Sequence, residues 1–443
     1  MRTSRSAMTE GKIVPSIVMF SLPLLGSSLV QQLYNTVDLL FVGNFTGKNG
    51  AAAVGSSGLV FTCLIGLFTG ISVGVNVLIA QAVGAKRWKE ASRAAHTALM
   101  VGFLGSILLT VLGILGAGPI LKLLRTPDQV FAEAIAYVRI YFLSMISMVV
   151  YNMGSSILRA YGDSRTPFYV LIVGGVTNVA ADYLFVAFLR QGVAGAAVAT
   201  SISQTVSAVG ILWCLCRGKS GIAVRLRELY IDWGLVGRIL RVGLPSGVQS
   251  MVITLSNIIV QWYINGYGDT AMAAFAAYFK LENFIYMPNL AFGQAVTTFV
   301  GQNLGAGNRE RIKKGTAVTG LMAVGMSVIM AVAMLSFKQQ LFRCFVDDRE
   351  VVALGVQVVA VTFPFYWLYG ILEVAGGAVR GMGRAMSSMC VTLSCLCIGR
   401  ICLLAVSTRW IKGLEGVAVV YPVTWGMTAV LMTVLFWKSF KRS

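Results

Sequence analysis

Long runs of apolar residues follow one another along almost the whole chain of 443 residues, separated by short polar segments. An apolar run of about twenty residues is long enough for an α-helix to cross the ~30 Å hydrocarbon core of a membrane. The pattern therefore predicts an all-α integral membrane protein with twelve transmembrane helices. The predicted spans are residues 15–43, 51–80, 94–118, 132–158, 167–189, 192–216, 236–266, 271–303, 315–337, 352–379, 386–408 and 414–437.

Composition and charge agree with this interpretation. The chain is 57% hydrophobic and only 12% charged, whereas a soluble domain is about 25% charged. Of the 36 Lys and Arg residues, 24 fall on the side of the N-terminus and 10 on the opposite side when Arg139, Arg238 and Arg241, which lie toward span ends, are counted with the adjoining loops; the other two, Lys280 and Arg400, lie inside spans. Because cationic residues collect on the cytoplasmic side, we expect both termini in the cytoplasm of a prokaryotic cell, at its inner membrane. The net charge of +19 then indicates anionic lipid headgroups as partners, and no nucleic acid.

The chain carries the same plan twice. Leu22-Pro23 matches Leu244-Pro245, Gln81 matches Gln302, and Arg159 matches Arg380, always 221 or 222 residues apart. We expect an N-terminal six-helix bundle at 1–216, a basic cytoplasmic linker at 217–233 and a C-terminal six-helix bundle at 234–443. Because six is even, the copies are parallel repeats, related by a pseudo-two-fold axis along the membrane normal. Two such bundles enclose a V-shaped central cleft, and rocking one against the other gives alternating access.

Polar side chains gather on helix faces within the first bundle. Gln31, Tyr34, Asn35 and Asp38 follow i, i+3, i+4, i+7 spacing, Asn178 and Asp182 are four apart, and Thr200, Ser203 and Gln204 repeat the pattern. Such spacing places each set on one face of its helix. Charged groups inside spans are costly and usually face a polar cavity, so we expect these faces to turn inward. The oxygen atoms of this set suit a proton or a Na⁺ ion.

The second half lacks this set, since Val260, Gly399 and Leu403 stand at the matching positions. Its buried charges are Lys280, Glu282 and Glu373. Lys280 and Glu282 are two residues apart and cannot pair on one helix face. Glu373 follows an aromatic cluster, which suits an organic cation; pairing of Glu373 with Lys280 or Arg400 is the structural alternative. Pro23 and Pro245 lie inside spans, where the lost hydrogen bond favours a kink.

Together these residues resemble the multidrug and toxic compound extrusion (MATE) family over essentially the full length. The resemblance rests on the segment Gly301-Gln302-Asn303-Leu304-Gly305-Ala306, its first-half copy at 80–85, and the helix ends at 158–163 and 379–383. The chain looks most like the DinF-type branch, in which an Asp, an Asn-x-x-x-Asp and a Thr form a cation network. The resemblance implies that Asp38, Asn178, Asp182 and Thr200 couple transport to ion flow and that Pro23 is a helix-bend position.

We accordingly expect a secondary antiporter that exports organic cations or amphipathic drugs in exchange for inward H⁺ or Na⁺. It is expected to work as a monomer, to have no cofactor and to catalyse no reaction. Gln31, Tyr34, Asn35, Ser203, Gln204, Lys280, Glu282 and Glu373 are candidate substrate contacts. Unlike the NorM-like branch, the seventh span holds no acidic residue, which leaves the role of Glu373 open. The alternative function is a flippase for lipid-linked glycans, which would favour a cationic cavity, whereas the buried charges here lean acidic.

Overall fold

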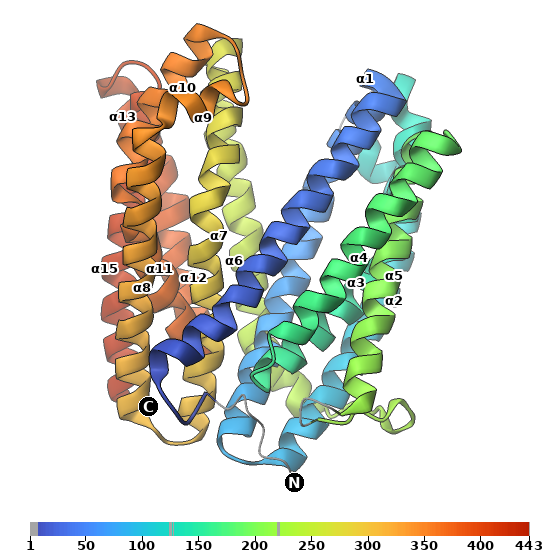
Figure 1. The fold of residues 1–443 in the computed structure, drawn as a ribbon, viewed down its shortest axis with the longest axis vertical. Helices are drawn as coiled ribbons and strands as arrows, with labels where there is room; N and C mark the ends of the chain where they lie inside the picture. Colours follow the sequence, from blue (N-terminus) through green and yellow to red (C-terminus); the bar gives the residue numbers. More distant parts are fainter. Residues whose placement is uncertain (1–7, 124–125, 127, 219–221, 443) are drawn as a thin grey trace. The chain divides into compact units, whose positions relative to one another are not determined.

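The computed structural model describes residues 8–442 except 124–125, 127 and 219–221, and it leaves the side chains of 47–60, 62–63, 123, 128 and 226 undescribed. The predicted linker therefore lies partly outside the described residues. The described chain is helical and contains no strand, which confirms the all-α fold class. Its longer helices, drawn in Figure 1, are α1 (Ile13–Gly84), α2 (Trp88–Leu123), α3 (Asp128–Ala160), α4 (Arg165–Asp182), α5 (Gly192–Arg217), α6 (Trp233–Asn265), α7 (Asp269–Gly305), α8 (Arg309–Ser336), α10 (Arg349–Thr362), α11 (Tyr366–Gly381), α12 (Ala385–Thr392), α13 (Arg400–Trp410) and α15 (Val420–Arg442).

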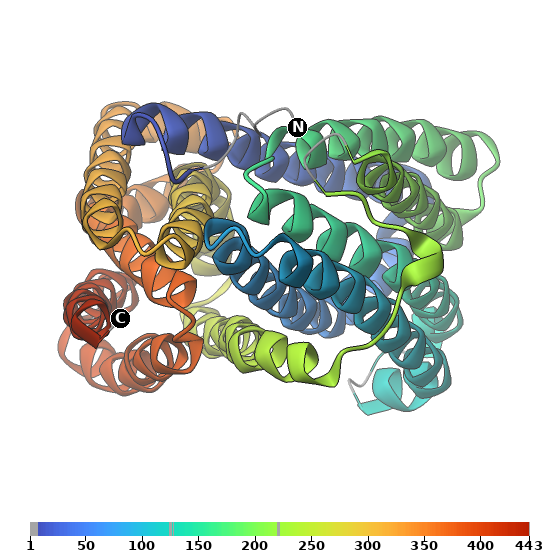
Figure 2. The same ribbon diagram turned by 90° about the horizontal axis from the view of Figure 1, so that it is seen from below.

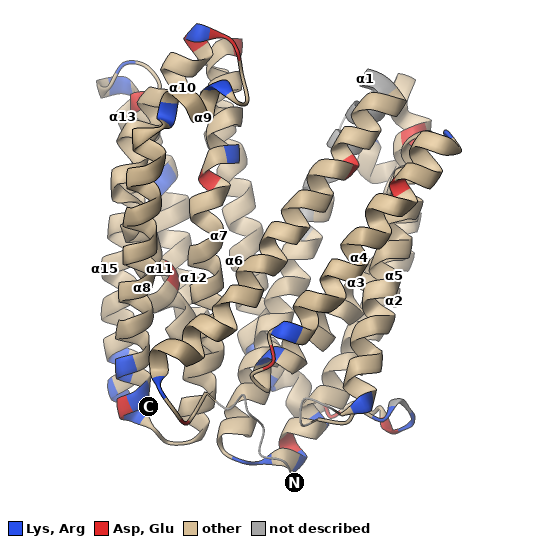
Figure 3. Ribbon diagram, viewed as in Figure 1, with Lys and Arg blue, Asp and Glu red and all other residues tan. Residues whose placement is uncertain are grey.

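Eleven described helical segments are long and apolar enough to cross a membrane. They match eleven of the twelve predicted spans. The twelfth, predicted at 271–303, corresponds to α7, a helix of 37 residues whose apolar character is interrupted by Lys280, Glu282 and Asn289. Helix α1 contains the first two spans, Ile13–Thr46 and Leu64–Gly84, and the backbone between them is helical where we expected a loop. In Figure 3, Lys, Arg, Asp and Glu lie mostly at the ends of the helices, which leaves the apolar stretches between them for the membrane.

Among the described residues the chain forms two compact units. Unit 1 comprises Leu22–Leu244, and unit 2 comprises Met8–Ser21 with Pro245–Ser443. The chain therefore passes from one unit to the other inside α1 and again inside α6. Both transitions fall at the matched Leu-Pro positions, where proline removes one backbone hydrogen bond from the helix.

Each unit has its own apolar core. In unit 1, α3 packs against α2 and α5, and α4 packs against α5 (Figures 1 and 2). In unit 2, α11 packs against α7, α8 and α15. The two cores are distinct clusters of buried side chains, one around Ile79, Ile157 and Ile211 and the other around Tyr278 and Tyr366.

A repeated hydrogen bond shows that the two units share one packing plan. In unit 1, Asn76 Nδ2 donates to the carbonyl oxygen of Ser156 at 3.3 Å. In unit 2, Thr297 Oγ1 donates to the carbonyl oxygen of Gly377 at 3.0 Å. Both residues of the second pair stand 221 positions after their counterparts. In lipid, small residues let two helices approach closely, and polar side chains form hydrogen bonds between them.

The Gln302-Asn303 pair near the end of α7 has a direct structural role within unit 2. Gln302 Oε1 accepts a hydrogen bond from the Met8 amide at 2.8 Å, and Asn303 Nδ2 donates to the Met8 carbonyl oxygen at 3.2 Å. Arg311 donates to the carbonyl oxygens of Glu10 and Gly11. Gln302 and Asn303 are fully buried, so these bonds fix the backbone just before α1 to the end of α7.

Candidate ion-coupling site

Two adjacent glycines let three helices meet at the predicted N-terminal site. A Cβ atom placed on Gly175 of α4 would lie 3.3 Å from Val30 Cγ1 of α1, and one placed on Gly174 would lie 3.4 Å from the Ser203 carbonyl oxygen of α5. Because neither glycine has a side chain, α1 approaches α4 on one side and α5 approaches it on the other. Asn178 and Asp182 follow on α4, one and two turns after this approach.

The side chains of Asp182 and Asn178 are almost completely buried, with 0% and 1% of their surfaces exposed, and Asp38 on α1 is half-buried. Both Asp182 carboxylate oxygens, both polar atoms of the Asn178 amide, and Asp38 Oδ1 are buried with no hydrogen-bond partner among the described residues. Buried polar groups in folded proteins are nearly always hydrogen-bonded, so such a concentration of exceptions indicates a functional site.

The charges of the site act on one another. Asp38 and Asp182 are close enough for their carboxylates to repel. Tyr137 of α3 is within electrostatic range of both, and Tyr141 is within range of Asp38 and Tyr34. The sequence analysis did not include these two tyrosines. Their spacing of four residues on a membrane-spanning helix was the available signal, but many aromatic pairs at that spacing serve only in packing.

The remaining predicted residues of this half lie on α1 and α5, and they differ from Asp38, Asn178 and Asp182 in exposure and in their hydrogen bonds. Thr200 is half-buried on α5, and its carbonyl oxygen accepts a hydrogen bond from Ser203 Oγ at 3.0 Å. Gln204 of α5 lies close enough to Tyr34 of α1 for their side chains to interact. Gln31 and Asn35 are exposed on α1. Thus α1 and α5 are joined by a polar contact beside the unpartnered carboxylates.

A change of helix type follows Asp182 directly. Helix α4 ends at Asp182 and continues as the π-helix η1 (Tyr183–Phe188). The second half has a π-helix in the corresponding span, η4 (Leu393–Gly399), which is followed by the buried Arg400. Short π-helical segments are rare and are frequent at functional sites. The apolar periodicity of these spans predicted regular helices and could not reveal them.

An apolar cluster lies one helical turn beyond the polar residues on all three helices. Val42, Val186 and Ala196 form this cluster, and each is at most 1% exposed. Val42 stands four residues after Asp38, Val186 four after Asp182, and Ala196 four before Thr200. We call these three residues the apolar cap. It lies at the same end of the polar residues on all three helices, since Val42 and Val186 follow Asp38 and Asp182 on α1 and α4, whereas Ala196 precedes Thr200 on α5 and still clusters with them.

In unit 2 the structure gives Glu373 a partner that the sequence analysis did not consider. Glu373 Oε1 forms an ion pair with Arg380 Nη2 at 2.8 Å, and both side chains are 13% exposed. The structural alternative, a pairing of Glu373 with Lys280 or Arg400, is therefore wrong in its partner. The pair lies seven residues apart on α11, a separation at which two full turns bring side chains to the same face. Gly293 of α7 makes room for it, because a Cβ there would lie 2.7 Å from Glu373 Oε1.

The other charged residues of unit 2 have contacts of their own. Lys280 is exposed, with its ammonium group 5.7 Å from the centre of the Phe345 ring. Glu282 accepts a long hydrogen bond, 3.4 Å, from Tyr366 Oη. Arg400 is 5% exposed, donates to Asn257 Oδ1 at 3.1 Å and lies over the Tyr421 ring at 4.9 Å. These contacts do not join Lys280, Glu282 and Glu373 directly, although Tyr286 and Tyr369 lie within electrostatic range of both glutamates.

The donor set near Asp38 is suited to a proton or a hard cation. No group of three or more His, Cys, Asp or Glu residues occurs in the described part of the chain, so the described residues offer no donor set of the transition-metal type. Three carboxylate oxygens and an amide oxygen without a hydrogen-bond partner among the described residues instead match the oxygen ligands of a Na⁺-like ion, and each carboxylate can equally accept a proton.

Known proteins resemble this chain in sequence and fold. The protein named probable multidrug resistance protein YoeA, from Bacillus subtilis, is 29% identical over 98% of this chain and 96% of its own. The probable multidrug resistance protein YpnP of the same organism is 28% identical over 92% of this chain and 91% of its own length. A solved structure described as the outward-facing conformation of a multidrug resistance MATE family transporter shares the fold with a TM-score of 0.94, at 22% identity over 100% of both chains.

The profile of the MatE family matches the chain twice, at residues 23–184 and 245–406. The two matches begin at the two matched prolines and end in corresponding spans, as the internal repeat predicts. Together they cover well over half of the sequence. The protein therefore belongs to the MatE family, the multidrug and toxic compound extrusion (MATE) transporters.

Proposed function

We propose that the protein is a secondary antiporter that exports organic cations or amphipathic drugs in exchange for inward H⁺ or Na⁺. The observation that carries the proposal is the group of buried, unpartnered atoms on Asp38, Asn178 and Asp182. The names of the related Bacillus proteins, which describe probable multidrug resistance proteins, support export of drugs as the function.

The proposed coupling follows from the energetics of buried charge. Two ionised carboxylates with buried, unpartnered oxygen atoms are unfavourable in a membrane interior, and each also raises the energy of the other. A cationic substrate near them relieves part of this cost, and so does a bound proton or Na⁺. Because both relieve the same cost, binding of one lowers the affinity for the other, and this competition is the basis of exchange.

We assign coupling to Asp38, Asn178, Asp182 and Thr200, and substrate contacts to Gln31, Tyr34, Asn35, Ser203 and Gln204. Bending of α1 at Pro23, fifteen residues before Asp38, is the proposed movement that accompanies ion binding. The ion pair between Glu373 and Arg380 favours a structural role for Glu373 over substrate binding, whereas Lys280 is exposed and is kept as a proposed substrate contact. Glu282 is retained as an acidic substrate contact.

We further propose that the transporter works as a monomer in the inner membrane of a prokaryotic cell, with both termini in the cytoplasm. Its two six-helix halves, 1–216 and 234–443, are joined by the basic segment 217–233. Rocking of one half against the other moves the substrate by alternating access. Labelling of single cysteines placed at residues 12 and 438 in intact cells and in everted vesicles tests the orientation, since only everted vesicles expose cytoplasmic sites.

The test of function is uptake of ethidium into everted membrane vesicles, with a proton gradient or a Na⁺ gradient imposed separately. Uptake driven by one gradient is expected for the wild type and is lost in Asp182→Asn. The matched control is Asp269→Asn, because Asp269 is exposed at the start of α7. If no organic cation is taken up under either gradient, the antiport proposal fails, and transport of phosphorylated lipids becomes the function to test.

A further inference from the structure

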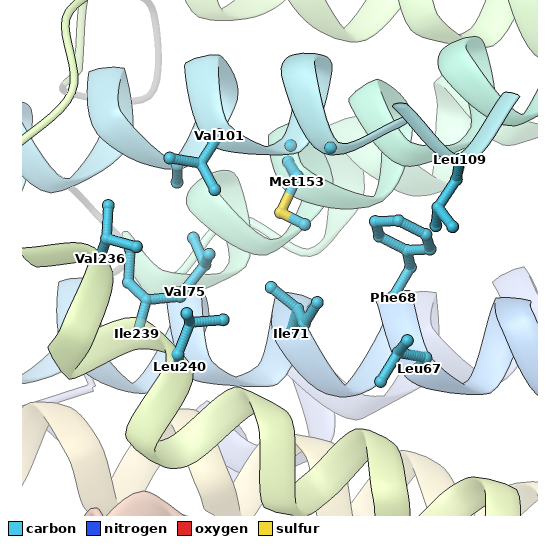
Figure 4. A pocket seen from close by; sticks show the side chains of 13 residues that line it. Leu67, Phe68, Ile71, Val75, Val101, Leu109, Met153, Val236, Ile239 and Leu240 are labelled. Atoms are coloured by element: carbon cyan, nitrogen blue, oxygen red, sulfur yellow. The ribbon is translucent and has the colours of Figure 1, made fainter. Parts of the chain in front are cut away.

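Unit 1 contains an apolar cavity that the proposed transport mechanism does not use. Its volume is about 250 Å³, and Figure 4 shows the side chains around it. The second span of α1 contributes Leu67 and Ile71, α2 contributes Val101 and Gly105, α3 contributes Met153, and the start of α6 contributes Ile239. Every lining side chain ends in carbon, hydrogen or sulfur.

Filling this cavity with water and leaving it empty are both unfavourable in free energy. A buried water needs two or more polar partners, and cavities lined only by apolar side chains stay dry. An empty cavity forfeits the dispersion contacts that its walls would otherwise make, so its cost rises with its volume. The lining helices α1, α2, α3 and α6 all carry candidate membrane spans, and lipid acyl chains are the apolar material that surrounds such spans.

The cavity reaches the first turns of α6, because Val236 and Ile239 line it and Arg238 stands between them in the sequence. Trp88 and Trp233, at the first positions of α2 and α6, are 51% and 75% exposed, as expected for tryptophans at a membrane interface. Glu90 lies between two arginines, with ion pairs to Arg87 at 2.8 Å and to Arg238 at 2.6 Å. Two guanidinium groups that share one carboxylate leave a net positive charge, which an anionic phosphate complements.

The second half of the repeat has larger residues at two positions that line the cavity in the first half. Gly102 and Gly105 of α2 correspond, 221 residues later, to Ala323 and Met326 of α8. A Cβ atom placed on Gly105 would meet no atom within 4 Å, so a larger residue is sterically acceptable at this position. The first half nevertheless has glycine there, and with it the open space.

We propose that this cavity is a binding site for one acyl chain of an anionic phospholipid, whose phosphate is held by Arg87 and Arg238. The site is independent of the ion-coupling residues. It joins the start of α6 to α1, α2 and α3 through a lipid, and it would make bound lipid part of the stable structure of unit 1.

The test uses the full-length protein in nanodiscs that contain a phosphatidylglycerol with a photoreactive diazirine on one acyl chain. After illumination, mass spectrometry of peptides identifies the labelled residues. The wild type is expected to be labelled at lining residues such as Met153 and Ile239. Gly105→Leu fills the cavity and is expected to lose this labelling. Gly118→Leu is the matched control, because Gly118 also lies in α2, a Cβ atom placed on it would meet no atom within 4 Å, and it does not line the cavity.

A second variant tests the headgroup without altering the cavity. Arg238→Gln leaves Glu90 paired with Arg87 and removes the net charge, so labelling by phosphatidylglycerol is expected to fall about fivefold, the factor that one basic residue contributes near a charged membrane surface. Wild-type labelling by a phosphatidylcholine probe is expected to be equally low.

Three results would overturn the proposal. They are equal labelling in Gly105→Leu and the wild type, equal labelling by the two phospholipids, and displacement of the lipid probe by excess ethidium, which would assign the cavity to a transported cation. Ethidium uptake by each variant, compared with the wild type, shows whether the protein is folded in the same membranes.

Discussion

Asp38 and Asp182, on helices α1 and α4, lie close enough for their carboxylates to repel, and both carry buried oxygen atoms that no described residue hydrogen-bonds. The repeat places apolar residues, Val260 and Leu403, at the corresponding positions of the second half. The acidic pair is thus a property of unit 1 alone among these matched positions. This asymmetry is the basis of the first prediction.

Asparagine at either acidic position is expected to uncouple transport. Asp38→Asn and Asp182→Asn each remove a titratable group while retaining shape, so gradient-driven ethidium uptake should fall at least about tenfold, the factor that corresponds to ~1.4 kcal/mol. Because each substitution also removes repulsion between buried carboxylates, the thermal unfolding midpoint should rise. A fall in both transport and melting temperature would instead indicate that the carboxylates are structural.

The apolar cap is expected to restrict ion movement through the coupling site. Val186→Asn places an amide among Val42, Ala196 and the unpartnered oxygens, and a polar group there can carry water. Proteoliposomes with this variant should show ion flux down an imposed gradient without any substrate. Val186→Ile, which keeps the cap apolar, should behave like the wild type. Equal flux in both variants would remove the cap from the mechanism.

The ion pair between Glu373 and Arg380 is expected to stabilise unit 2 and to have little part in coupling. Glu373→Gln leaves the Arg380 guanidinium buried without a counter-charge, and breaking a buried pair from one side costs roughly 3–5 kcal/mol. The double variant Glu373→Gln with Arg380→Gln should be less destabilised than Glu373→Gln alone. Thermal unfolding of the wild type, the two single variants and the double variant measures this coupling. A selective loss of ethidium affinity with unchanged stability would favour substrate binding by Glu373.

Close backbone contact between α1 and α6 is expected to require glycine at position 74. A Cβ atom there would collide with the carbonyl oxygen of Ile239 and come within 2.8 Å of the Gly243 Cα atom. Because the obstacle is backbone, Gly74→Ala should destabilise the protein by about 1–3 kcal/mol. Gly43→Ala, in the same helix with open space around it, is the control and should leave the unfolding temperature unchanged. Equal midpoints for the two variants would contradict the close approach.

Some residues of the site could be predicted from the sequence, and others could not. Asp38, Asn178 and Asp182 could be found because charged and amide side chains are rare inside apolar spans and their spacing places them on single helix faces. Tyr137 and Tyr141 could not be separated from ordinary aromatic packing. Arg380 was identified only as a matched helix-end residue, since whether its side chain turns inward toward Glu373 depends on the room that Gly293 leaves on another helix.

The sequence by itself determined the membrane-spanning helices, the two-fold repeat and the polar faces, because apolar run length, residue spacing and rare buried charges are local properties of the chain. Only the tertiary structure decided which buried charges have partners, where α4 becomes a π-helix, which apolar residues cover the acidic pair, and where a cavity remains open. Each of these depends on how side chains from separate helices fill the same space, and no pattern along one helix specifies that.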